Sequence, residues 1–240
     1  MNSVVQNSNP QSANKSVQFL ASTSLLASLG PHAIETLHSM ATVIDLRRNK
    51  TLWQVGQMAD AIYILRTGAV REYVSHLDDR ETTIGIYARR TTIGLAGAVE
   101  NNTWFTTAIA HEDSTLYRIP TALVTRLSEQ FPRLSKAITN QIFSHMKQAQ
   151  LLTPNMLNSS AQSRLAEVLI ELASAFAITD SRGTIINIKL THRIIATMTG
   201  TTRETVSFAI LDLRKRGLIK NDGKRFIVTN MDALKAIVTA

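Results

Sequence analysis

An arginine and a glutamate stand side by side within TGTTRETVSFAILDLRKRG, residues 199–217 of the chain. Gly200 can supply the left-handed backbone of a tight corner, and the hydroxyl of Thr202 can cap a helix that begins after it. In the first turn of such a helix, Arg203 can donate to O6 and N7 of guanine, and Glu204 can accept from N4 of cytosine. The stretch therefore predicts a helix that reads base edges in the major groove of DNA.

The apolar spacing of this helix predicts which of its side chains are free to reach DNA. The residues expected to form a buried stripe, at i, i+3, i+4 and i+7, are Val206, Ala209, Ile210 and Leu213. At about 100° per residue, the side chains expected to point away from that stripe are Glu204, Phe208, Leu211 and Lys215. We predict base contacts from the first two turns, namely Arg203, Glu204, Ser207 and Phe208, the last through a thymine methyl group. The polar side chains predicted to contact phosphates are Thr191, His192, Arg193, Thr202, Thr205, Arg214, Arg216, Lys224 and Arg225.

Positive charge concentrates around this helix. Residues 191–225 hold 8 Lys and Arg against 3 Asp and Glu, and the whole chain of 240 residues carries a formal net charge of +8. An excess of this sign favours an anionic partner such as nucleic acid or an acidic membrane surface. A solvated basic helix face is the alternative interpretation. The corner, a hairpin and a preceding helix accompany the charges, however, and that combination favours DNA binding.

Other helices and a hairpin are predicted to hold this helix in place. Residues 161–176 form a strongly amphipathic pattern, and residues 192–200 are expected to form the first helix of a helix–turn–helix pair. One short strand is expected over residues 184–190. Asp222-Gly223 joins two short β-runs, which is typical of a tight hairpin. We therefore expect a winged helix–turn–helix domain over residues 159–240.

The residues before this domain predict a separate, β-rich unit. From about Thr42 to Ile119, short β-branched runs are cut by turn residues, which is typical of a small β-sandwich or barrel. Short helices are expected to flank these strands, so that the predicted domain spans residues 19–130. The first 18 residues are rich in Asn, Ser and Gln and predict a disordered tail.

A long helix with a hinge at its end is expected between the two domains, over residues 131–158. Its residues that recur at steps of three and four, close to a heptad pattern, are Ile138, Ile142, His145, Ala149 and Leu152. Pairing of this seam with a second copy of the chain is one interpretation, and packing on the β-rich domain is the other. Pro154 is expected to kink or end the helix, because proline lacks the amide hydrogen that a helix interior uses.

The composition and motifs exclude several kinds of site. The chain has no cysteine, which rules out disulfides, thiolate catalysis and Cys-ligated metal centres. It has no Gly-rich phosphate loop, no G-x-S-x-G or H-E-x-x-H motif and no clustered carboxylate pair, so we predict neither an enzyme nor a metal site. No apolar run approaches the roughly 20 residues that span a bilayer, and the N-terminal stretch lacks the apolar core of a signal peptide. These features predict a cytoplasmic protein.

Two motifs resemble those of the Crp/Fnr superfamily of bacterial transcription factors. G-T-T-R-E-T-V, residues 200–206, is similar to the start of the family's recognition helix. V-G-Q-M-A-D-A-I-Y-I-L-R-T-G-A-V, residues 55–70, is similar to the signature of its cyclic-nucleotide-binding β-roll. The resemblance runs from about residue 25 to the C-terminus and implies an α+β fold: a β-roll sensor, a long dimerisation helix and a winged helix–turn–helix. It also implies a homodimer that binds palindromic DNA and acts on RNA polymerase.

The sequence departs from the family where cAMP-binding relatives hold the nucleotide. Gly-Glu-Leu is replaced by Gly94-Leu95-Ala96, and Arg-Ser/Thr-Ala by Trp104-Phe105-Thr106-Thr107. No lysine or arginine occurs between residues 91 and 117, and a buried phosphate without a cationic partner is strongly unfavourable. We therefore reject cAMP as the effector. The residues predicted to line the corresponding effector pocket are Gly94, Leu95, Trp104, Phe105, Thr106 and Gln150, with Trp104 and Phe105 either filling it or stacking on an apolar ligand.

The other effectors of this family fit the sequence no better. Iron–sulfur sensing requires cysteines. The 2-oxoglutarate sensing of the cyanobacterial nitrogen regulators uses an arginine and a glutamate on the dimerisation helix, where a gapless comparison places His145 and Gln150. For haem, His111 and His145 are the candidate axial ligands, and we interpret both as structural. The effector, if there is one, stays open at this point.

A second hypothesis keeps the fold and changes the partner. It makes the chain a module that senses a small molecule and whose helix–turn–helix contacts another protein. Salt dependence separates the two hypotheses, because only a protein that neutralises DNA phosphates releases many counterions on binding.

Overall fold

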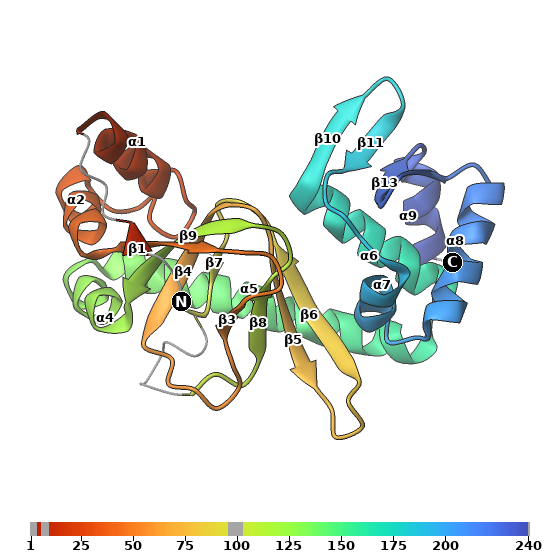
Figure 1. The fold of residues 1–240 in the computed structure, drawn as a ribbon, viewed down its shortest axis with the longest axis horizontal. Helices are drawn as coiled ribbons and strands as arrows, with labels where there is room; N and C mark the ends of the chain where they lie inside the picture. The colour runs from red at the N-terminus through yellow and green to blue at the C-terminus, as the bar shows by residue number, and fades with distance from the viewer. Residues whose placement is uncertain (1–3, 6–9, 96–102, 240) are drawn as a thin grey trace. The chain divides into compact units, whose positions relative to one another are not determined.

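The computed structural model describes residues 4–5, 10–95 and 103–239 of the chain (Figure 1). Contacts within the chain divide it into two compact units. The first comprises Met1–Tyr73 and Ile86–Gln148, and the second comprises Val74–Gly85 and Ala149–Ala240. The described elements confirm the predicted α+β class, with a β-rich unit followed by a mainly helical one.

Two antiparallel sheets form most of the first unit, and residues 74–85, which belong to the second unit, contribute to one of them. The strands of these sheets are β1 (Val4–Val5), β2 (Thr42–Leu46), β3 (Thr51–Trp53), β4 (Ala61–Thr67), β5 (Val70–Ser75), β6 (Glu81–Tyr87), β7 (Thr92–Ile93), β8 (Thr107–Ala110) and β9 (Ser114–Pro120). One sheet has the order β1-β2-β9-β4-β7, and the other has the order β3-β8-β5-β6. This arrangement agrees with the two-layered β-structure expected from the short β-branched runs.

The strand β4 is apolar over most of its length because both of its faces are covered. Successive side chains of a strand point to opposite faces of its sheet. Ile62 and Ile64 join an apolar core with the helices, whereas Tyr63 and Leu65 join a second core that contains residues of both sheets. Because both faces are covered, the residues from Ala61 to Leu65 are all buried.

The helices that accompany these sheets are α1 (Pro10–Ala21), α2 (Pro31–Met40) and α4 (Thr121–Gln130). The structure differs here from the sequence prediction, which placed a disordered tail up to residue 18. Phe19 and Leu20, at the end of α1, are buried in one apolar core with Ile34 and Leu37 of α2. Burial of these apolar side chains offsets the polar composition of the segment and orders it as a helix.

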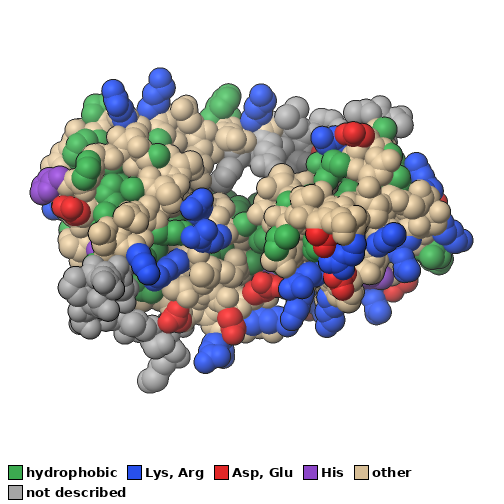
Figure 2. Space-filling view, turned by 90° about the horizontal axis from the view of Figure 1, so that it is seen from above, with side chains coloured by type: hydrophobic (Ala, Val, Ile, Leu, Met, Phe, Trp, Pro, Cys, Tyr) green, Lys and Arg blue, Asp and Glu red, His purple; other side chains and the backbone are tan. Residues whose placement is uncertain are grey.

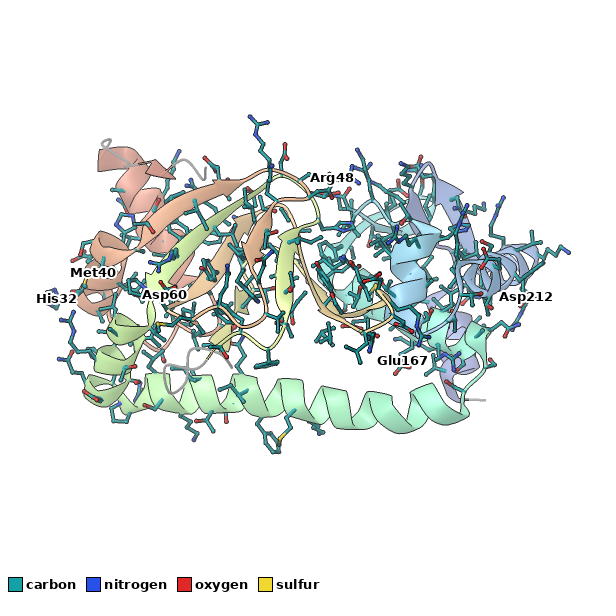
Figure 3. All side chains as sticks on the ribbon, turned by 60° about the horizontal axis from the view of Figure 1, so that its bottom comes forward. His32, Met40, Arg48, Asp60, Glu167 and Asp212 are labelled. Carbon is teal, nitrogen blue, oxygen red and sulfur yellow. The ribbon has the colours of Figure 1, made fainter. Side chains whose placement is uncertain are left out.

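The long helix α5 runs from Pro132 to Asn158 over 27 residues and lies along the lower edge of the view in Figure 3. Pro154 was predicted to kink or end the helix, and the structure shows that it does not end it. A proline inside a helix removes one backbone hydrogen bond, and the helix continues here for four residues beyond it. The prediction of a long helix after the β-rich part of the chain is confirmed.

The second unit contains the helices and strands that follow α5. They are α6 (Ala161–Phe176), β10 (Ala177–Asp180), β11 (Gly183–Ile186), α7 (His192–Thr199), α8 (Arg203–Lys215), β12 (Ile219–Asp222), β13 (Arg225–Val228) and α9 (Met231–Thr239). The strands form one sheet of order β10-β11-β13-β12. The sequence predicted one strand before α7, and the structure has a hairpin of two. Gly183 allows the turn of that hairpin with a φ of +128°, where a Cβ atom would collide with the carbonyl of Val228.

The scaffold helix α6 has the amphipathic pattern that its sequence predicts. The hydroxyl of Ser160 caps it by accepting a hydrogen bond from the amide of Ser163 at 3.1 Å. Its buried apolar residues are Leu165, Ala166, Val168, Leu169, Leu172 and Ala173. The helix packs on α7, α8 and α9, and thereby supports the helix that carries Arg203 and Glu204. Among the described residues, no helix is long and apolar enough to cross a membrane.

Candidate nucleic-acid interface

The corner between α7 and α8 forms as its sequence predicts. Thr191 caps α7 by accepting from the amide of Ile194 at 3.2 Å, and Thr202 caps α8 by accepting from the amide of Thr205 at 3.1 Å. Gly200 ends α7 in the left-handed region, with φ +62° and ψ +34°. Glycine adopts this conformation without the steric cost that a Cβ atom imposes. The corner therefore sets where α8 begins.

The faces of α8 also agree with the prediction. The buried residues of the helix are Val206, Ala209, Ile210 and Leu213. Arg203 and Glu204 are exposed in the first turn, and Phe208 is 74% exposed one turn later. The rear of the helix is thus fixed in a core while its first two turns present polar and aromatic groups to solvent. This is the arrangement that a helix needs to enter the major groove.

We expect Leu213→Ala to destabilise this unit by about 2–5 kcal/mol, because it leaves a cavity behind the helix. Leu213 is fully buried, whereas Leu211 on the same helix is 46% exposed. Leu211→Ala is therefore the control, with an expected change within about 0.5 kcal/mol. Urea denaturation of both variants measures the difference. Equal losses would show that α8 is not anchored through Leu213.

Several basic side chains of this unit are exposed, and lysine and arginine side chains project from its surface in Figure 2. Arg193, Arg214 and Lys224 are exposed, whereas Arg225 is half-buried. The exposed Lys220 of β12 was not among the predicted phosphate contacts, although its position in the predicted hairpin was available as a signal.

One of the predicted phosphate contacts already has an acidic partner. Arg216 pairs with Asp212 at 3.6 Å, and Figure 3 labels Asp212 on α8. An exposed ion pair of this kind contributes little to stability. It therefore leaves the arginine able to exchange its partner for a phosphate.

The remaining predicted contacts are smaller side chains close to the corner. Thr202 is exposed, and its hydroxyl also lies 2.9 Å from that of Thr205. Thr191, His192 and Thr205 are half-buried, as is Ser207 among the predicted base contacts. These side chains are accessible in part, and two of them serve the local structure of the corner as caps.

The wing is tied to the rest of the unit by hydrogen bonds. The amide of Leu190 donates to the carbonyl of Lys224 at 2.8 Å, which joins the start of α7 to the β12–β13 turn. Arg182 bonds Asp180 at 2.8 Å and Asp222 at 3.2 Å, which joins the two hairpins. The hydrogen bonds from Arg182 lower the pKa of the Asp180 carboxyl. This pairing stabilises the fold above the unfolded-state pKa of Asp180 and is lost as the pH falls through the lower folded value.

The chain matches two domain families along its length. Residues 43–131 match the cyclic nucleotide-binding domain, and residues 163–237 match the Crp-like helix-turn-helix domain. The chain belongs to the Crp/Fnr family of transcription regulators. This membership agrees with the prediction of a DNA-binding regulator rather than an enzyme, and it does not favour the alternative of a helix–turn–helix used for protein contacts.

Relatives and solved structures of the Crp/Fnr family show the extent of the similarity. The chain is 28% identical over 192 residues to the global nitrogen regulator of Synechococcus elongatus, covering 79% of this chain and 86% of the relative. It is 21% identical over 217 residues to the CRP-like cAMP-activated global transcriptional regulator of Mycobacterium tuberculosis, covering 90% and 97%. The structure of FixK2 from Bradyrhizobium japonicum has a TM-score of 0.75 at 20% identity, covering 83% and 98%. At this identity, the similarity to FixK2 shows that the two chains share a fold.

Trp104, which the sequence comparison aligned with the phosphate-binding motif of cAMP-binding relatives, belongs to the core that contains residues of both sheets. Its side chain is 4% exposed and stacks on Trp53 with ring centroids 4.3 Å apart. A Cβ atom at Gly94 would approach the Trp104 ring to 2.7 Å, so the glycine makes room for the indole. Tyr63 stacks on Trp53 in turn, and burial raises the pKa of the Tyr63 hydroxyl. The aromatic side chains therefore pack on one another as a core.

The predicted pocket residues differ in burial and in the apolar core that they join. Leu95 belongs to the core with the helices, whereas Trp104 belongs to the core between the sheets, and Phe105 is 63% exposed. Thr106 is buried and donates to the carboxylate of Glu72 at 2.5 Å. The side chain of Gln150 lies outside the described residues.

A polar cluster around Glu72 was not predicted from the sequence. Tyr87 donates to this carboxylate at 2.9 Å, and the indole N–H of Trp53 donates to the hydroxyl of Thr106 at 3.4 Å. The residues come from three different strands and one loop, so only the pairing of the strands brings them together. No local spacing along the chain would have indicated the cluster.

On α5, the described side chains show which face is covered. Ile138 and Ile142, predicted as seam residues, are partly buried against the core of the first unit. Phe143 and Met146 are 59% and 47% exposed. Packing on the β-rich unit, the second of the two interpretations, therefore accounts for Ile138 and Ile142. The predicted seam residues whose side chains lie outside the described residues are His145, Ala149 and Leu152.

Proposed function

We propose that this regulator is a homodimer that binds a palindromic DNA site through Arg203 and Glu204 of each copy. The observation that carries the proposal is the anchoring of α8, whose buried rear face leaves both side chains exposed in its first turn. In such dimers, two recognition helices enter major grooves about one helical turn apart, roughly 34–36 Å. The basic residues at the end of α8 and in the wing then contact the phosphates on either side.

Selection of bound duplexes from a random pool, with purified protein and no added ligand, tests this proposal. Recovery of a palindrome with a G·C pair in each half-site is the expected result, because Arg203 and Glu204 read guanine and cytosine. Binding that weakens steeply with salt accompanies it, since phosphate contacts release counterions. Recovery of no common sequence would contradict the proposal.

The second copy is proposed to bind along α5 through Phe143 and Met146. These side chains are three residues apart and so lie on the same side of the helix. They are exposed, whereas Ile138 and Ile142 are used by the core of their own chain. A pair of large apolar side chains that stays in solvent on a long helix favours an interface. Both copies would use the same helix face, as a two-fold dimer requires.

We propose further that cAMP is not the effector. The sequence comparison aligns Trp104 with the phosphate-binding motif of cAMP-binding relatives, and its uncharged ring is buried. An unpaired phosphate beside it would be strongly disfavoured. We expect cAMP at millimolar concentration to change neither the melting temperature of the protein nor its affinity for the selected palindrome. Differential scanning fluorimetry and fluorescence anisotropy measure the two quantities. A rise in melting temperature that grows with cAMP concentration would contradict the proposal, because ligands that bind the folded state stabilise it.

RNA polymerase is the remaining partner that we propose, since a regulator bound near a promoter acts by recruiting or blocking it. A protein whose targets are chromosomal sites works in the cytoplasm of a bacterium. Co-sedimentation of the DNA-bound dimer with RNA polymerase tests whether the two proteins bind each other.

A further inference from the structure

Two short contacts meet at the Ser207 hydroxyl. Its Oγ donates to the carbonyl of Arg203 at 2.8 Å, one turn earlier in α8, and lies 2.8 Å from Nδ1 of His192. A hydroxyl has one hydrogen to donate, and a carbonyl can only accept. With the hydrogen of Ser207 on the Arg203 carbonyl, the 2.8 Å contact to His192 forms a hydrogen bond when Nδ1 carries a hydrogen and donates it to Ser207.

The position of His192 in the fold suits it to donate to Ser207. It is the first residue of α7, directly after the Thr191 cap, and Leu190 before it is held by the wing at 2.8 Å. Both the neutral ring with its hydrogen on Nδ1 and the doubly protonated ring donate from Nδ1. The direction of the hydrogen bond to Ser207 is therefore the same in these two states.

We propose that the Arg203 carbonyl and the His192 ring together make Ser207 an acceptor of hydrogen bonds towards DNA, so that Ser207 reads an amino group of a base. A serine hydroxyl has two acceptor lone pairs, and one of them remains after the bond from His192. In the major groove, amino groups belong to cytosine N4 and adenine N6, whereas guanine O6 and N7 and thymine O4 are acceptors. Ser207 thus favours cytosine or adenine and rejects guanine or thymine at its base. The inference rests on the proposed function, because it needs α8 in the major groove.

The test removes single amino groups from the selected palindrome, with purine in place of adenine or 2-pyrimidinone in place of cytosine. At the base read by Ser207, we expect wild-type protein to lose affinity about fivefold, the effect of one neutral hydrogen bond. The affinity of Ser207→Ala for DNA should not change when this amino group is removed. His192→Ala should respond less and should accept guanine or thymine there, because the hydroxyl then loses one of the two contacts that hold its hydrogen on the Arg203 carbonyl, and it can turn and donate to the base.

Two further variants separate a positioning role for His192 from a structural one. The amide nitrogen of His192→Asn takes the place of Nδ1 and should restore the wild-type base preference, whereas that of His192→Gln takes the place of Nε2 and should not. His38→Ala, on α2, is the control for loss of a partly exposed histidine. If His192→Ala does not fold, the comparison of Asn with Gln still decides the question.

The outcomes distinguish this inference from the proposed function. If wild-type protein selects no palindrome, the proposed function fails and the inference falls with it. If it selects one and all His192 variants keep the wild-type base preference, the inference alone is overturned. A uniform loss of affinity for all sequences in Ser207→Ala would also overturn it, because that result places Ser207 on a phosphate.

Discussion

Phe143→Asp combined with Met146→Asp is expected to convert the protein to a monomer and to lower its affinity for the palindrome by a factor of about 10²–10⁴. A dimer that contacts both half-sites binds more tightly than a monomer by about this factor, because its second copy binds at a high effective concentration. The two side chains are exposed in the single chain, so the charges cost little in its own folding. In a dimer interface, however, they would place four carboxylates in an apolar contact. Sedimentation equilibrium measures the oligomeric state, and fluorescence anisotropy measures the affinity.

Controls for this experiment come from the same chain. Met40→Asp makes the same change at a methionine on α2 that is 45% exposed, and it should leave both the dimer and the affinity unchanged. Ile142→Asp should instead lower the melting temperature, because Ile142 packs on the core of its own unit. A double variant that stays dimeric and binds the palindrome normally would show that α5 pairs through another face or not at all.

Arg203→Ala is expected to lower affinity for the palindrome by about 1–3 kcal/mol per half-site and to relax specificity at a single base pair. The reason is that a planar guanidinium donates to O6 and N7 of guanine together, and alanine donates to neither. Arg203→Lys should recover only part of the loss, because an ammonium group lacks the fork geometry. Affinities for duplexes with each base pair exchanged in turn measure where the specificity falls.

Lys224→Ala is the control for Arg203→Ala, since it removes a charge of the same sign from the wing. It should weaken binding equally for all sequences and reduce the slope of log affinity against log salt by about one for each copy, or about two for the dimer. If Arg203→Ala behaves in this way instead, Arg203 contacts a phosphate, and the proposed recognition of guanine by this residue is wrong.

Local features of the sequence determined most of the second unit. The caps at Thr191 and Thr202, the glycine corner and the buried stripe of α8 each depend on residues within one or two turns of one another. Their hydrogen bonds and periodicity are properties of a short segment, and so they can be predicted without knowledge of what lies far away. The strand and turn residues of the first unit are also local features, so its β-rich character could be predicted from the sequence for the same reason.

Tertiary structure decided the features that depend on residues distant in sequence. Docking on α2 orders α1, and the core of the first unit covers Ile142 while it leaves Phe143 exposed. The stacking of Trp104 on Trp53 and the bond between His192 and Ser207 each join separate segments of the chain. A helical pattern shows that a face is apolar, but only the packing of the whole chain determines which surface covers it. Burial and hydrogen-bond partners across the fold are therefore set by the three-dimensional arrangement, and no local spacing specifies them.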